Sequence, residues 1–234
     1  MTTQIVKKLL NEHLFTVDRT LEDYLGFFGS EFRRDLESLT ADQHWLDAGA
    51  GEAYAQREYV GSRDLKEIVP SRARATAVSF KSIRSVEIPV DVQFRYLVGR
   101  TFESIPDIEI GPVDLVTDVV GVLNYTEHID QVLQTYLRLL KPGGKIYVFL
   151  PTLITWIEDG KSLRKTFFDW LQSIPGLEVK EITDGKNGEI KNSAFTIQKT
   201  VENPVIPGLQ LEAAAHRHSL VRIFSEKSTT SNQT

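Results

Sequence analysis

The most informative stretch of this 234-residue chain is residues 45–53, Trp45-Leu46-Asp47-Ala48-Gly49-Ala50-Gly51-Glu52-Ala53. Apolar residues lead into an acid, two glycines alternate with alanines, and helix-forming residues follow to position 60. This pattern predicts a strand that ends in a glycine-rich turn and opens into a helix. Such a turn lets a ligand approach bare backbone, and the unpaired N–H groups of the first helical turn face that ligand.

Strands and helices alternate downstream of this turn, which favours a parallel sheet with crossover helices. The apolar run at 113–120 is typical of a strand that is buried on both faces. Lys141-Pro142-Gly143-Gly144 ends a strongly amphipathic helix, because proline cannot continue a helix and glycine allows a tight reversal. We predict strands at 44–48, 73–80, 92–98, 113–120 and 145–150, and helices at 53–60, 63–69 and 129–140.

Both ends of the chain add to this core. Residues 1–40 carry apolar positions near the spacing of one helix face with a break at Gly29, and they predict a leader of two or three short helices. Further along, we predict a helix at 163–174, an antiparallel strand pair at 177–183 and 194–200, an edge hairpin within a β extension at 201–226, and a disordered polar tail at 227–234.

The run from Asp47 to Gly51 resembles the first motif of the class I S-adenosylmethionine-dependent methyltransferases, an acid followed by Gly-x-Gly-x-Gly. Ala53 stands where the third glycine would fall. A second resemblance is the acid-led strand Val113-Asp114-Leu115-Val116, followed by Leu139-Leu140-Lys141-Pro142-Gly143-Gly144-Lys145, which is similar to the Leu-x-Pro-Gly-Gly turn before the family's fifth strand.

The resemblance covers about residues 44–200 and implies a Rossmann-like α/β domain at 41–200. Its sheet would have seven strands, mostly parallel, with an antiparallel last strand. The leader 1–40 would then either cover the cofactor site as a lid or pack as an ordinary helical layer. The cofactor would be S-adenosylmethionine and the acceptor a small molecule.

The same resemblance implies where the cofactor would bind, at the ends of the first four strands. Asn124 and Tyr125, in the loop after the fourth strand, would line the acceptor site. Methyl transfer is an in-line displacement in which positioning supplies much of the acceleration, so the chemistry requires no dedicated acid or base. The predicted cofactor-binding residues are Asp47, Ala48, Gly49, Ala50, Gly51, Ser79, Phe80, Arg100, Asp118 and Val119.

Two positions depart from the family pattern. Ser79 stands where an acid ordinarily accepts hydrogen bonds from the ribose, and Arg100 stands where an Asp ordinarily receives the adenine amino group, although Glu103 or Asp107 could replace that contact. Losing one hydrogen bond to a charged group weakens binding about tenfold or more. The chain is therefore an active methyltransferase or an inactive binding or scaffold protein of the same fold. A minority alternative is a site for a neutral or anionic adenosine ligand.

Several other classes are disfavoured. A nicotinamide-binding turn would place a third glycine where Tyr54 stands. The chain has no cysteine, which removes thiol catalysis and thiolate metal sites, and no acidic cluster accompanies His216 and His218, so no metal is expected. The net charge of −5 gives no attraction to nucleic acid or to an anionic membrane. Without a signal peptide or a membrane-spanning run, the expected location is the cytoplasm; the oligomeric state stays open.

Overall fold

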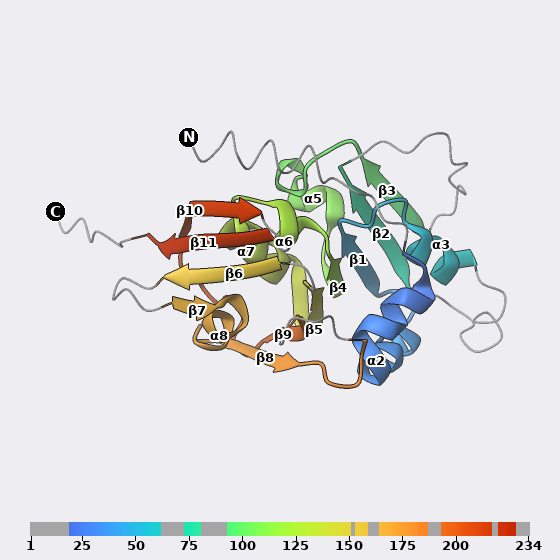
Figure 1. The fold of residues 1–234 in the computed structure, drawn as a ribbon. Helices are drawn as coiled ribbons and strands as arrows, with labels where there is room; N and C mark the ends of the chain where they lie inside the picture. The colour runs from blue at the N-terminus through green and yellow to red at the C-terminus, as the bar shows by residue number, and fades with distance from the viewer. Residues whose placement is uncertain are drawn as a thin grey trace.

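A seven-stranded sheet runs through the centre of the protein in the computed structural model (Figure 1). Its order is β3-β2-β1-β4-β5-β9-β8. β1 to β5 are parallel, whereas β9 is antiparallel to both of its neighbours, β5 and β8. The predicted mostly parallel sheet with a reversed last strand is confirmed. Its strands are β1 His44–Ala48, β2 Arg74–Ser79, β3 Phe94–Val98, β4 Val113–Val119, β5 Leu140–Phe149, β8 Leu177–Glu181 and β9 Ala194–Lys199.

The structure describes residues 19–61, 73–80, 93–150, 153–158, 164–186, 193–216 and 220–227. Three predicted features lie outside these residues in whole or in part. They are the first part of the leader (1–18), the helix at 63–69 and the polar tail beyond 227.

The strand order reverses between β1 and β4. The chain moves outward from β1 through β2 to β3, then returns to the other side of β1 to form β4 and β5. In open α/β sheets, ligands bind in the crevice outside the carboxyl ends of the strands at such a reversal. The turn after β1 and the loop after β4 therefore flank the position where this fold class binds its ligands.

Helices cover both faces of the sheet. α2 (Leu21–Ser38) and α3 (Tyr54–Gly61) share one hydrophobic cluster with the sheet. On the opposite face, α5 (Asp107–Ile110), α7 (Ile129–Leu139) and α8 (Phe167–Gln172) belong to the second cluster. A capping box between Thr20 and Asp23 begins α2. The protein is thus a three-layer α/β fold.

The leader helix packs as a structural layer. Phe28 and Phe32 are fully buried, and their rings lie 5.2 and 5.0 Å from the ring of Tyr147 in β5. The predicted break is present at Gly29, which has φ 68°. A side chain there would meet the carboxylate of Asp184, which accepts hydrogen bonds from the backbone and hydroxyl of Ser30.

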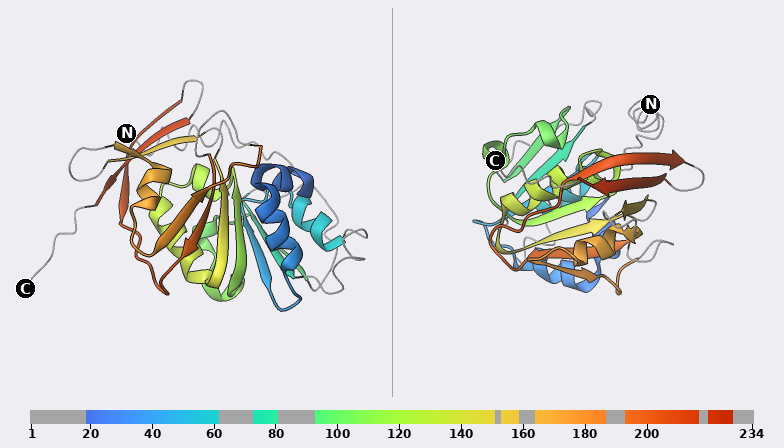
Figure 2. Two further views of the ribbon diagram at one scale, coloured as in Figure 1. Left: turned by 90° about the horizontal axis from the view of Figure 1, so that it is seen from below. Right: turned by 90° about the vertical axis from the view of Figure 1, so that its left-hand side faces the viewer.

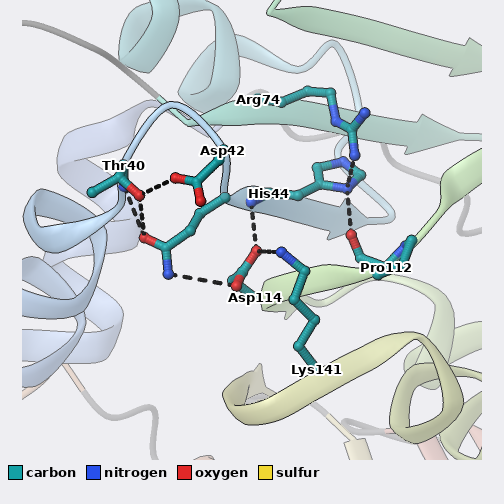
Figure 3. Close-up of polar contacts among 8 residues, drawn as sticks. Thr40, Asp42, His44, Arg74, Pro112, Asp114 and Lys141 are labelled. Carbon is teal, nitrogen blue, oxygen red and sulfur yellow. Dashed lines mark hydrogen bonds and ion pairs between the residues drawn. The ribbon is translucent and has the colours of Figure 1, made fainter.

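Polar side chains join the amino ends of β1, β2 and β4 (Figure 3). The carboxylate of Asp114 accepts from the backbone N–H of His44 at 2.8 Å and pairs with Lys141 at 2.7 Å. The ring of His44 also bonds Thr76 and lies 3.1 Å from Arg74. Burial and the charge of Arg74 lower the pKa of His44 to about 4. The acid that leads β4 therefore ties the starts of two central strands together.

Two predicted boundaries are wrong. β5 begins at Leu140, and its pairing with β4 jumps from Val113↔Leu140 to Leu115↔Lys145, so the Pro-Gly-Gly segment loops out of a strand. The helix predicted at 163–174 is shorter, because Arg164–Thr166 forms strand β7 and Thr166 caps α8 through the N–H of Asp169.

A second sheet of four strands stands on the β5 side of the central sheet (Figures 1 and 2). The hairpin predicted within 201–226 is present; it pairs with β6 in this sheet, and its strand β10 forms the edge. β6 and β7 are strands that the pattern did not predict. The order is β10-β11-β6-β7, formed by β10 Leu209–His216, β11 Leu220–Glu226, β6 Leu153–Glu158 and β7 Arg164–Thr166.

The segment before the hairpin is fastened to α7. Gln134 donates to the carbonyl of Pro204 and accepts from the N–H of Ile206, and Asp130 accepts from the N–H of Leu209 at 3.0 Å. The second sheet is thus anchored to the main core. Within the residues that the structure describes, none of the helices has the length and apolar character needed to cross a membrane.

Replacing Phe28 with alanine should lower the free energy of unfolding by about 3–5 kcal/mol, because the change leaves a cavity between α2 and the sheet. Denaturant titration measures it. Ile108→Ala is the matched control, since Ile108 is 92% exposed and its loss should change stability by less than about 0.5 kcal/mol. Equal, small effects of both changes would mean that α2 is a loosely attached lid.

Candidate functional site

The glycine turn after β1 is tied to the neighbouring strands. The N–H groups of Gly49 and Ala50 both donate to the carbonyl of Val78, at 3.0 and 2.8 Å. The carbonyl of Gly51 accepts from the hydroxyl of Tyr96 at 2.5 Å. Positive φ values of 87° and 57° at Gly49 and Gly51 explain the two glycines. The predicted turn is therefore present, with two of its N–H groups already bonded within the protein.

Gly49 also makes room for the loop after β4. A side chain at Gly49 would lie 2.3 Å from the Cα atom of Gly121, and one at Gly121 would lie 2.1 Å from the carbonyl of Ala48. The two loops thus touch backbone to backbone. The structure gives Gly49 a packing reason, while its contact with a cofactor stays a prediction.

Asp47 lies at the centre of a buried polar network. Its carboxylate accepts from Tyr24 at 2.7 Å, from Gln56 at 2.7 Å and from Thr117 at 2.6 Å. Trp45 in turn donates to the hydroxyl of Thr117. Burial raises the pKa of Asp47 to about 6, and the three hydrogen bonds oppose this shift. The acid of the motif therefore joins α2, α3 and β4 to β1, and no part of it is exposed.

Asp118 plays a similar part for the loop after β4. Its carboxylate accepts from the N–H groups of Gly121 and Leu123, both at 2.9 Å, and from the hydroxyl of Tyr136 at 2.8 Å. Burial raises the pKa of Asp118 to about 7. The side chain holds the loop in place and is fully buried. The contact of Asp118 with a cofactor stays a prediction.

Backbone strain is present at Val120, the residue that follows β4. Val119, the last residue of β4, is fully buried. Val120 has φ 49°, a left-handed conformation that a β-branched residue rarely adopts, and its N–H donates to the carbonyl of Phe149. Strain of this kind is found preferentially at functional sites. The strained residue begins the loop after β4, and the next residue, Gly121, touches the turn after β1.

The predicted acceptor residues lie on α6 (Val122–Tyr125), a single helical turn after β4. Asn124 is 3% exposed, and its Oδ1 atom has no hydrogen-bond partner among the described residues. Tyr125 is half-buried, and burial and the charge of Asp118 raise its pKa, whereas Arg19 opposes the shift. Arg19 acts on Asp47 in the same direction, so this residue, just before α2, lies near this edge.

The ends of β2 and β3 are more open. Phe80 is 56% exposed directly after the buried Ser79, and Gly99 donates its N–H to the carbonyl of Ser79. A side chain built at Gly99 would meet none of the described residues within 4 Å. This corner of the site has room and an exposed aromatic ring.

The charges around β3 are paired within the protein. Arg100 donates to both carboxylate oxygens of Glu109 at 2.8 Å. This ion pair balances the positive charge of Arg100, on which the alternative of an anionic ligand rests. Glu103 accepts from Thr126, and Asp107 pairs with Arg138. Neither acid that was expected to replace the adenine contact is therefore free in this structure.

Several residues that shape this edge carry no recognisable signal in the sequence. Tyr24, Gln56 and Thr117 satisfy Asp47, and Arg222 in β11 contacts α6, yet each stands in an ordinary helix or strand pattern. Among the described residues no group of His, Asp or Glu could hold a metal ion. His218 and the side chain of His216 lie outside the described residues.

Comparisons with known proteins give similar structures at low identity. No family model and no curated protein sequence matches the chain. A protein described as a hemolysin from Streptococcus thermophilus is 14% identical, with a TM-score of 0.39 over 75% of this chain and 66% of its own. MnmC2 from Aquifex aeolicus is 15% identical, with a TM-score of 0.45 over 80% of this chain and 62% of its own. The chain thus spans less than two thirds of each, and neither likeness carries a functional argument.

Replacing Asp118 with asparagine should flatten the dependence of stability on pH. Because the pKa of Asp118 is higher in the folded protein (about 7) than its ordinary 3.8, the folded state binds the proton more tightly. The contribution of this group to the free energy of unfolding is therefore greatest below about pH 4 and declines as pH rises towards 7, by at most about 1.4 kcal/mol per unit.

The measurement is denaturant unfolding of both proteins between pH 4 and 8. The lowered pKa of His44 works in the opposite direction, with stability lost as pH falls below its ordinary 6.5, but His44 is present in both proteins and cancels in the comparison. Parallel stability profiles for the two proteins would show that folding does not raise the pKa of Asp118.

Proposed function

We propose that the chain binds S-adenosylmethionine at the carboxyl ends of β1, β2 and β4 and transfers its methyl group to a small-molecule acceptor. The observation that carries the proposal is the sheet order with its reversed β9 strand, combined with a glycine turn that opens at the point of strand reversal. The strand order alone is found in α/β proteins that bind many different ligands. The glycine turn at this place makes an adenosine-type cofactor the preferred one.

The open corner beside β3 suits the adenosine part of the cofactor. Gly99 leaves space there, and the exposed ring of Phe80 offers a flat apolar surface on which a base can stack. The methionine end would then reach the turn at Ala50 and Gly51. Tyr125 and Asn124 would face the acceptor from the other side of the strand reversal.

The chain's own contribution to the reaction would be positioning. The cofactor, when bound, supplies an electrophilic methyl group. In-line displacement gains much of its acceleration from holding donor and acceptor at the right distance. The buried hydrogen bonds of Asp118 hold the loop after β4, and those of Asp47 hold β1 just before its turn, which suits this role.

An inactive binding protein of the same fold is the second candidate. Arg100 is neutralised by Glu109, and Ser79 gives no carboxylate to a ribose. Asp47 keeps its fold-holding bonds whether or not a cofactor binds. The motif could therefore persist in a protein that has lost the activity.

Calorimetric titration with S-adenosylhomocysteine tests the proposal. The unmodified protein should bind it with a dissociation constant in the micromolar range, and Phe80→Ala should weaken binding about tenfold through loss of stacking. Ile108→Ala is the matched control, because it removes an exposed apolar side chain from α5 and should leave affinity unchanged.

Three outcomes would count against the proposal in different ways. Absence of micromolar binding by the unmodified protein would favour the inactive alternative. Equal affinities of the two variants would mean that the base does not lie against β2. Tighter binding of adenosine diphosphate than of S-adenosylhomocysteine would support an anionic ligand instead.

A further inference from the structure

The single turn of helix α6 lies between two buried charges that come from different sheets. Asp118 of β4 accepts from the N–H groups of Gly121 and Leu123 at the start of the turn. Arg222 of β11 donates to the carbonyls of Leu123 and Thr126 at its end, at 2.6 and 2.7 Å. An anion at the amino end and a cation at the carboxyl end match the polarity of the helix dipole.

Burial of the Arg222 side chain is energetically unfavourable by itself. It is 2% exposed, its Nε atom has no hydrogen-bond partner, and no carboxylate pairs with it among the described residues. Burial of an unpaired cation is unfavourable unless polar groups replace its water. The groups that replace this water include the carbonyls of Leu123 and Thr126, the hydroxyl of Thr155 and the ring of Phe224, and Asp118 attracts the charge.

The turn cannot hold this position alone. A helix of four residues gains too few hydrogen bonds to offset its nucleation, so its place in the fold is decided by outside contacts. Leu123 packs in the main hydrophobic cluster, and the polar contacts of the turn include those with Asp118 in the central sheet and with Arg222 in the second sheet. The C-terminal hairpin thereby reaches the loop that carries Asn124 and Tyr125.

We propose that Arg222 is a positioning residue: by binding the carbonyl groups of α6, it makes the second sheet fix Asn124 and Tyr125 at the acceptor side of the site. The assignment of α6 to the acceptor side rests on the proposed function. The hydrogen bonds from Arg222 to the carbonyls of Leu123 and Thr126, called the clamp from here on, do not depend on that function. The buried Oδ1 atom of Asn124, which lacks a partner among the described residues, is the group whose direction the clamp would decide.

The test compares Arg222→Met, Arg222→Lys and a control, Ile157→Ala. Ile157 is fully buried in β6 of the same sheet, so its loss lowers stability without removing a bond to α6. Hydrogen exchange followed by mass spectrometry reports on residues 119–127 in each protein, with the α7 segment 129–139 as internal reference. Denaturant concentration is adjusted so that overall stability is matched.

In the absence of ligand, the amides of Asn124 and Thr126 should exchange at least tenfold faster in Arg222→Met than in Ile157→Ala, as expected for loss of a hydrogen bond from a charged donor. Arg222→Lys should lie between them, because an ammonium group retains the charge and can still reach one carbonyl. Equal exchange in the methionine variant and the control would overturn the clamp. Should the methionine variant fail to fold, the lysine variant decides by the same comparison.

The second measurement adds S-adenosylhomocysteine at saturation. Binding should slow exchange of residues 119–127 in the unmodified protein and in Ile157→Ala, and this slowing should be lost in Arg222→Met. Full retention of the slowing in that variant would overturn the positioning role. No binding by the unmodified protein would overturn the proposed function and the acceptor-side assignment, whereas the ligand-free comparison would still decide the clamp.

Discussion

The carboxylate of Asp47 is the point at which the leader helix, the first strand, the helix after it and the fourth strand are joined. A buried carboxylate is tolerated only when donors replace its water, and here Tyr24, Gln56 and Thr117 supply three. Each donor comes from a different element, so all must be in place together. The constraint fixes how α2 lies on the sheet and how β4 is aligned with β1. The positions of the flanking loops and of the candidate site therefore depend on this arrangement.

The two acids in the site also change what the glycine motif means. Both Asp47 and Asp118 are predicted to bind a cofactor, and both also join elements of the fold through their carboxylates. Gly49 likewise admits the backbone of Gly121. Asp47 and Gly49 therefore have a role in the fold itself, whether or not a cofactor binds. Phe80 and Gly99, at the ends of β2 and β3, are the positions that the proposed binding adds to the glycine turn.

Most of the sheet could be predicted from the sequence because its signals are local. The apolar run of β4 indicates a buried strand at that position. The glycines after β1 and the proline after α7 indicate where those elements end. Other features depend on partners far away in the sequence. β6 is a strand because β11 pairs with it, and Tyr24 matters because Asp47 lies beneath it. Arg222 stands in an ordinary strand pattern, and nothing near it shows that it contacts α6.

The second sheet is assembled from two stretches of chain that are separated by α8, β8 and β9. β6 is covered on one side by β7 and on the other by β11. A shortened protein that ended before the hairpin would leave β6 with an unpaired row of backbone groups, and such open edges recruit strands from other molecules. Self-association of a trimmed core would then reflect this exposed edge and say nothing about the quaternary structure of the intact chain.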